Sequence, residues 1–326
     1  MASVSIIITT FNRVDALALT LERLDAQVGP NEVQVVVTDD GSTDGTTEML
    51  ESLELSVDLC LARNPANRGI SAGRNRALEI ATGDYLILLS DDLLVEPSFV
   101  RQHVDRLVAH PDAWIVGGFS QLEDLMVTPF GRFVDSLEST FEMARLTDEV
   151  EPGLWEMTSP TARNLSLPRP DLDRTGWFDE QFRSGCEDQD LAHRAKPLGI
   201  RFLYDASITC VHNDQAADLD RYCAQQERFA HDTVLLCEKR PEVHGVTPFH
   251  VVNGPVDPSD DLSVNLRRRA KAAVASDAGR TTMRKTISAL ESAGAPDPVL
   301  FRAYRLLIGA HIFRGWRAGL ETAQAT

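Results

Sequence analysis

The 326-residue chain has 32 Lys and Arg against 49 Asp and Glu, a formal net charge of −17. Its composition is that of a globular protein, and no run approaches the roughly 18 apolar residues of a membrane span. From Leu262 onward the balance reverses, with eleven Lys and Arg against four Asp and Glu, so the preceding acidic body is a poor partner for nucleic acid. The first residues carry no basic leader, and the five cysteines form no Cys-x-x-Cys pair, so we expect a cytoplasmic protein with reduced thiols.

Strands and helices alternate through the first part of the chain. The apolar runs Val4–Thr9, Val33–Val37 and Ser56–Ala62 are each followed by a polar loop and then a helical pattern. Asp15 and Asp44 are placed to cap the first two helices. This repetition predicts right-handed βαβ units and a Rossmann-like α/β fold, with a mostly parallel sheet and helices on both faces.

Two carboxylates follow the most apolar strand of the sequence. Tyr85–Leu89 can fill a strand buried on both faces, and Asp91 and Asp92 come directly after it. Ligands of open α/β folds bind at this carboxyl edge, and oxygen ligands suit Mg²⁺ or Mn²⁺. The structural alternative is that both acids begin a turn ahead of a helix opening at Pro97.

The sequence predicts the secondary structure of some of the following segments but not of others. Phe99–Ala109 is predicted to be a helix, whereas residues 120–160 show no clear period and are expected to be irregular. Arg163–Leu167 and Phe202–Val211 are predicted strands, and the second delivers His212, a possible metal ligand, to the same edge.

Charged residues at two predicted helix starts are further candidates. Arg74 can pair with a carboxylate or stack on a planar base, or it is one more solvated helix charge. Glu187 and Asp188 begin a later helix, where acids ordinarily complement the helix dipole, but an ionised carboxylate there also suits a general base.

Five segments in this order resemble the family 2 glycosyltransferases, inverting enzymes with the GT-A fold. They span roughly residues 3 to 213 and are Ser5–Arg13, Val37–Asp44, Gly73–Asn75, Ser90–Asp92, and Gly176–Glu180 with Glu187 and Asp188. The resemblance implies that Asp92 holds a divalent metal under the donor diphosphate, joined by His212, and that Asp188 takes the proton from the acceptor. The remaining donor-side residues implied are Thr9, Phe11, Arg13, Asp39, Asp40, Arg74 and Asp91.

The implied reaction moves a hexosyl or N-acetylhexosaminyl group from a nucleoside diphosphate sugar, first of all a UDP sugar, to an acceptor hydroxyl or amine. Ser90 stands where the family usually has the first acid of its Asp-x-Asp motif, which leaves the metal to Asp92 with Asp91. The same substitution favours an alternative, a catalytically silent nucleotide-sugar-binding or scaffold protein.

The C-terminal part has a different character. We predict a catalytic domain over residues 1–215 and a mostly helical region over 216–326, with a linker near 241–261. Gln225–Phe229 is similar to the Gln-x-x-Arg-Trp signature of processive family members, with Phe in place of Trp. The basic balance after Leu262 suits docking on the chain's own domain, on a second copy in a homodimer or on an anionic surface, or a solvated face.

Overall fold

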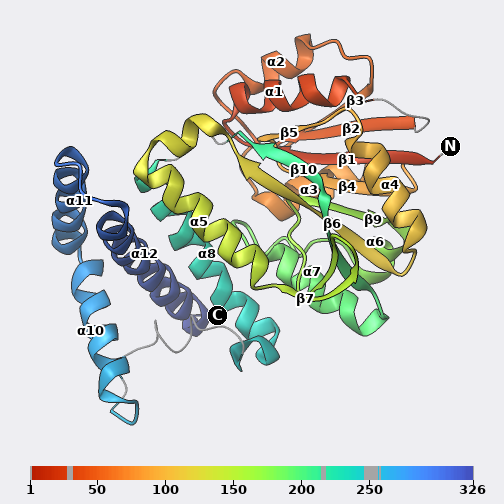
Figure 1. The fold of residues 1–326 in the computed structure, drawn as a ribbon. Coiled ribbons are helices and arrows are strands. Elements are labelled where there is room, and N and C mark those ends of the chain that lie inside the picture. The colour runs from red at the N-terminus through yellow and green to blue at the C-terminus, as the bar shows by residue number, and fades with distance from the viewer. Residues whose placement is uncertain (1, 28–31, 214–217, 246–255, 257, 326) are drawn as a thin grey trace. The chain divides into compact units, whose positions relative to one another are not determined.

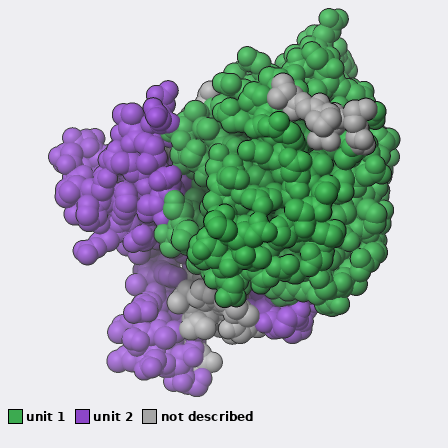
Figure 2. Space-filling view, turned by 45° about the vertical axis from the view of Figure 1, so that its right-hand side comes forward, with its two compact units in different colours: residues 1–122, 138–183, 187–215 green, residues 123–137, 184–186, 216–326 purple. Residues whose placement is uncertain are grey.

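A computed structural model of the chain describes residues 2–27, 32–213, 218–245, 256 and 258–325 (Figure 1). These residues divide into two compact units, coloured separately in Figure 2. Unit 1 comprises residues 1–122, 138–183 and 187–215, and unit 2 comprises residues 123–137, 184–186 and 216–326. Each unit is described by itself below.

Unit 1 is built on one sheet, in which the described residues form ten strands. Its first four strands pair in the order β3-β2-β1-β4, and all three pairings are parallel. The alternation of strand, loop and helix read from the sequence is therefore confirmed here. These strands are β1 (Ser3–Thr10), β2 (Glu32–Asp39), β3 (Asp58–Arg63) and β4 (Tyr85–Leu89).

The sheet continues from β4 through β9, β6, β10, β8 and β7. β9 runs antiparallel to both of its neighbours, β6 and β10 run parallel to each other, and the short β5 pairs antiparallel with β10. These strands are β5 (Leu93–Val95), β6 (Ala113–Gln121), β7 (Leu146–Glu151), β8 (Leu154–Met157), β9 (Asn164–Pro168) and β10 (Arg201–His212).

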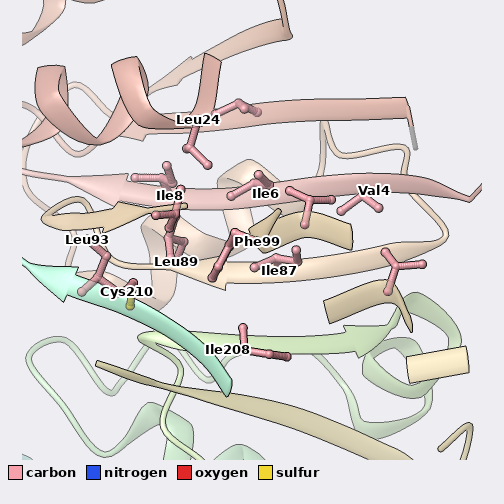
Figure 3. Close-up of a cluster of buried hydrophobic side chains, with 14 of the residues drawn as sticks. Val4, Ile6, Ile8, Leu24, Ile87, Leu89, Leu93, Phe99, Ile208 and Cys210 are labelled. Carbon is pink, nitrogen blue, oxygen red and sulfur yellow. The ribbon is translucent and has the colours of Figure 1, made fainter. Parts of the chain in front are cut away.

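Helices cover both faces of the sheet because the buried strands are apolar on both sides. In β1, Ile6 and Ile8 face one hydrophobic cluster, whereas Ile7 faces the other. Figure 3 shows the first cluster, in which Leu24 and Phe99 join the two isoleucines. The helices over that cluster are α1 (Val14–Asp25), α2 (Thr46–Ser52) and α4 (Phe99–Ala109); those over the other are α3 (Ile70–Leu78), α6 (Arg169–Thr175) and α7 (Glu187–Ala195), which the short η2 (Lys196–Leu198) follows.

Two expectations about local structure are wrong. Asp15 does not cap the first helix, because α1 begins at Val14 and the Val14 amide donates to Asp44 Oδ2 at 3.1 Å. A residue thirty positions away performs the capping that the nearest acid was expected to perform. Residues 120–160 are not irregular either, since they contain η1 (Glu123–Val127), α5 (Pro129–Met143), β7 and β8.

Unit 2 is helical apart from its connecting segments. The aromatic side chains of Phe130, Phe133 and Tyr304 pack against one another with ring centroids 5.2–6.0 Å apart. The predicted linker lies partly outside the described residues, at 246–255 and 257. Besides η1 and the first part of α5, which carries Phe130 and Phe133, its helices are α8 (Leu219–Lys239), η3 (Pro241–Gly245), α10 (Leu262–Ala275), α11 (Asp277–Ser292) and α12 (Asp297–Ala325). In the described part of the chain, none of them is long and apolar enough to cross a membrane.

Candidate active site

The polar residues singled out in the sequence collect at one edge of the sheet. β1, β2 and β4 are parallel and end at Thr10, Asp39 and Leu89, so their carboxyl ends share this edge. β9 is antiparallel, so it brings its amino end to the same place, where its first residue pairs with Leu89. As a result, the carbonyl of Arg163 accepts a hydrogen bond from the Ser90 amide at 2.9 Å.

Asp91 is tied into this edge by its side chain and its backbone. Its Oδ2 accepts a hydrogen bond from Thr10 Oγ1 at 2.8 Å, and its carbonyl accepts one from Thr20 Oγ1 at 3.0 Å. Burial raises the pKa of its carboxyl group to about 6, against the opposing charge of Arg13, whose Nη1 lies 3.6 Å from Oδ1. Asp91 therefore supports the architecture of the edge directly.

Asp92 differs from Asp91 because one of its carboxylate oxygens has no hydrogen-bond partner among the described residues. Oδ2 accepts hydrogen bonds from Arg13 Nη2 at 2.5 Å and contacts His212 Nε2 at 3.1 Å. Oδ1 is buried and has no hydrogen-bond partner among the described residues. Burial alone would raise the pKa of Asp92, but the hydrogen bond from His212 and the nearby positive charges lower it below its usual range. The carboxylate is therefore ionised, with a buried oxygen that no protein group satisfies.

An ionised, buried carboxylate oxygen of this kind is a suitable ligand for a divalent cation. Among the described residues no three His, Cys, Asp or Glu side chains converge on one point. Mg²⁺ and Mn²⁺ are commonly held by one or two carboxylates, with phosphate oxygens and water completing the shell, and Asp92 Oδ1 suits this arrangement. His212 turns Nε2 toward Asp92, and the same contact raises the pKa of His212 despite its burial. Its Nδ1 is buried and has no partner in the part of the chain described.

Asp39 and Asp40, at the end of β2, use their oxygens to build loops. Asp40 accepts hydrogen bonds from Asn64 Nδ2 at 2.7 Å, from the Arg68 amide at 3.0 Å and from the Gly69 amide at 2.8 Å. Asp39 Oδ1 accepts from the Ser42 amide at 2.8 Å, and its Oδ2 accepts from Thr47 Oγ1. Both carboxylates hold the walls of the predicted nucleotide site, and their direct contact with a nucleotide remains a prediction.

Thr9 and Phe11 lie at the end of β1. A Cβ placed on Gly73 would come within 2.2 Å of Thr9 Cγ2, so only glycine lets α3 approach the strand this closely. The Oγ1 of Thr9 is buried without a hydrogen-bond partner in the residues described. Phe11 keeps 41% of its surface exposed, which leaves an aromatic ring available for stacking.

Arg74 is neither solvated nor free. Its Nη1 pairs with Glu187 Oε1 at 2.5 Å, its Nη2 donates to the Ala162 carbonyl at 2.9 Å, and its guanidinium lies 5.2 Å from the centre of the Phe178 ring. Only 7% of the Arg74 side chain and 9% of the Glu187 side chain are exposed. The pair therefore clamps α3 to the start of α7, and the solvated-charge alternative for Arg74 is wrong.

Asp188 is the second residue of α7 and is partly exposed. Its Oδ1 accepts a hydrogen bond from the Gln189 amide at 2.8 Å. Burial acts to lower the pKa of Arg163, but the carboxylates of Glu138, Asp92 and Asp188 outweigh it and raise that pKa. Asp92, which is predicted to hold the metal, and Asp188, which is predicted to take the proton, therefore both act on the guanidinium of Arg163.

Further charged residues line this region from the segment between β6 and β9 and were not among the site residues predicted from the sequence. Arg163 Nη1 lies 3.1 Å from Glu138 Oε1, and its guanidinium lies 4.4 Å from the centre of the Phe119 ring. Glu142 accepts a hydrogen bond from Tyr204 at 2.5 Å. The signal available was weak: a charge just before the predicted strand at 163, and acids spaced by four in a segment whose helix was not recognised.

Comparison with known proteins agrees with this architecture. Residues 5–125 match the model of Glycosyl transferase family 2. A glycosyltransferase of Bacillus subtilis, YfnE, is 27% identical over 297 residues, which cover 78% of this chain and 74% of YfnE. The hyaluronan synthase of Pasteurella multocida is 28% identical over 236 residues, which cover 64% of this chain but 24% of the synthase. Residues 5–125 therefore carry the pattern of family 2 glycosyltransferases, as the resemblance in the sequence implied.

The fold has a counterpart of known structure. The mannosyltransferase PcManGT of Pyrobaculum calidifontis, solved in complex with GDP-Man and Mn²⁺, superposes with a TM-score of 0.62 at 19% identity. The match covers 96% of this chain and 87% of PcManGT. The GT-A fold expected from the sequence is thereby confirmed.

Proposed function

We propose that this chain transfers a sugar from a nucleoside diphosphate sugar to an acceptor hydroxyl or amine by direct displacement, with inversion at the anomeric carbon. The observation that carries the proposal is that two unlike carboxylates, Asp92 and Asp188, lie near enough to Arg163 for both charges to raise its pKa. Asp92 is ionised and has an unsatisfied buried oxygen, and Asp188 is partly exposed at a helix start. One suits a cation and the other suits a proton acceptor.

In the proposed reaction Asp188 accepts the proton of the acceptor group as that group attacks the anomeric carbon. The new bond to the acceptor forms while the bond to the diphosphate oxygen breaks, and the departing oxygen keeps the electron pair. Asp92, assisted by His212, would hold Mn²⁺ or Mg²⁺, which when bound neutralises charge on the leaving diphosphate. Arg13 and His212 keep Asp92 ionised and correctly turned for this role.

The donor would lie across the ends of β1 and β2. Phe11 offers a ring for the base, while Asp39 and Asp40 fix the loops around it. A UDP sugar is the first donor to test. The GDP-Man in the PcManGT structure makes GDP sugars the second.

The test is release of nucleoside diphosphate from a panel of nucleotide sugars by the parent, Asp188→Asn and a control, Asp173→Asn, which removes an acid near the end of α6. We expect Asp188→Asn to bind donor normally and to lose about 100-fold or more in turnover, with Asp173→Asn unaffected. Parental turnover in Asp188→Asn would refute the base assignment. Donor binding without any release by the parent would instead support the silent binding protein.

A further inference from the structure

Two arginines on the Asp188 side of the site are incompletely paired. Arg163 uses Nη1 for Glu138, whose other oxygen accepts a hydrogen bond from Gln121 Nε2 at 2.5 Å. Its Nε and Nη2 make no hydrogen bond with any residue that the structure describes. The guanidinium also lies over the ring of Phe119, 4.4 Å from its centre. One edge of a fork-shaped donor is therefore held in place without an acceptor.

Arg145, just after α5, has still fewer partners. Its backbone is fixed, since its amide donates to the Glu142 carbonyl at 3.0 Å and its carbonyl accepts from the Thr158 amide at 2.8 Å. Its guanidinium makes neither a hydrogen bond nor an ion pair with the described residues. Burial lowers the pKa of Arg145, against the opposing charge of Asp188. The carboxylates of Asp188 and Glu142 act on this pKa without forming an ion pair with Arg145, so its partial burial costs free energy that a directly bound anion would recover.

Besides burial, the charge of Arg163 lowers the pKa of Arg145, and the charge of Asp188 acts on the pKa of both arginines, so the two guanidiniums lie near each other and near the proposed base. The backbone agrees with this placement for Arg163, because Arg74 pairs with Glu187, next to Asp188, and donates to the carbonyl of Ala162, next to Arg163. Glu142, the nearest acid to Arg145 in sequence, is already bonded to Tyr204.

We propose that Arg145, with Arg163, binds an anionic group of the acceptor, a carboxylate or a phosphate, and so orients the acceptor's nucleophilic group toward Asp188. That the bound molecule is the acceptor rests on the proposed function, whereas binding of an anion by the two arginines does not require turnover. Arginine suits either anion, because its planar fork matches the two oxygens of each. An acceptor of neutral sugar alone would leave the two forks unpaired.

The experiment measures arginine reactivity in the full chain without any donor. Phenylglyoxal labels arginines, and peptide mass spectrometry reads the labelling rate at each one in the presence of glucuronic acid, glucose 6-phosphate or glucose at equal ionic strength. We expect one or both anionic sugars to slow labelling of Arg145 and Arg163 several-fold and glucose to have no effect. Arg76, which pairs with Glu79 on α3, should react at the same rate throughout. Protection by one anion alone would identify the acceptor's group as carboxylate or phosphate.

Two results would overturn the inference: no protection of Arg145 by either anion, or equal protection by glucose. A second measurement uses variants. Arg145→Gln should raise the KM for an anionic acceptor about tenfold with little change in kcat, because one charged hydrogen bond is lost, while Arg145→Lys recovers part of the loss and Arg76→Gln changes nothing. An unchanged KM in Arg145→Gln would also overturn it. Absence of turnover with every donor would count against the proposed function alone, since the labelling does not depend on it.

Discussion

Acidification should weaken the fold through one buried histidine in unit 1. His103, on α4, is fully buried, and its two ring nitrogens contact Ser166 Oγ at 2.8 Å and Asn164 Oδ1 at 2.9 Å. Asn164 Nδ2 donates to the Gly118 carbonyl, so Asn164 Oδ1 accepts from the histidine. Nε2 then carries the proton and Nδ1 accepts from Ser166, which satisfies the neutral ring completely.

Burial lowers the pKa of His103 to about 4, against the weaker opposing effects of the Asn164 hydrogen bond and the charge of Asp205. The unfolded chain has a histidine pKa of 6.5 and therefore takes up a proton first as the pH falls. The contribution of His103 to stability is thus present above pH 6.5, is lost progressively between pH 6.5 and 4, and levels off below. A shift of this size corresponds to about 3 kcal/mol of unfolding free energy.

The assay is urea unfolding of the parent and His103→Gln between pH 7 and pH 4. Subtraction is necessary because the pKa of Asp91 is raised by burial, so protonation of Asp91 stabilises the fold over part of the same range. We expect the difference in unfolding free energy, parent minus variant, to shrink by about 3 kcal/mol from pH 7 to pH 4. His231→Gln, which alters a half-exposed histidine of unit 2, serves as the control. A difference that stays constant with pH would refute the reasoning.

Three further outcomes follow from the packing and the charges. Arg74→Ala should lower the free energy of unfolding in urea by about 3–5 kcal/mol, because it leaves Glu187 buried without its counterion. Combining it with Glu187→Gln should recover part of that loss, and a double variant as unstable as the sum of the two single variants would contradict this. Gly315→Ala should lower the melting temperature, because its Cβ would lie 1.8 Å from the Glu227 carbonyl oxygen, whereas Gly309→Ala, with nothing nearer than 3.8 Å, should not. Asp92→Asn should reduce metal-dependent donor affinity in calorimetry with and without Mn²⁺, and equal affinities in parent and variant would remove Asp92 from the metal site.

Secondary structure could be predicted best from the sequence where burial requires a simple pattern of apolar residues. β1, β2 and β4 were recognised because strands buried on both faces must be apolar throughout, and the polar residues that follow them had to meet at one edge. The same reasoning failed between residues 120 and 160. β7 is largely exposed and carries Glu and Asp instead of an apolar alternation, so its pairing with β8 left no pattern to read.

Long-range contacts were equally out of reach for the candidate site. Arg74 carries the same charge whether it faces water or a carboxylate 113 positions later, and only the fold brings it to Glu187. The capping of α1 by Asp44 is similar, because local spacing favoured Asp15. The residue types showed which side chains could take part in binding or catalysis. Only the partners that the fold gives them show which of these side chains hold the structure together.

Asp91 and Asp92 illustrate this most clearly, since adjacent identical residues acquire opposite properties. Arg13 lies 3.6 Å from Asp91 but 2.5 Å from Asp92, and His212 forms an ion pair with Asp92 but not with Asp91. Desolvation therefore prevails at Asp91, whose pKa rises, while the positive partners prevail at Asp92, whose pKa falls. With Ser90 contributing no charge, Asp92 is the acid of this loop that stays ionised well into the acid range, and its Oδ1 has no hydrogen-bond partner among the described residues. A cation held there would depend on its phosphate and water ligands more than on the protein, so metal affinity should be weak without donor and rise when a nucleoside diphosphate is bound.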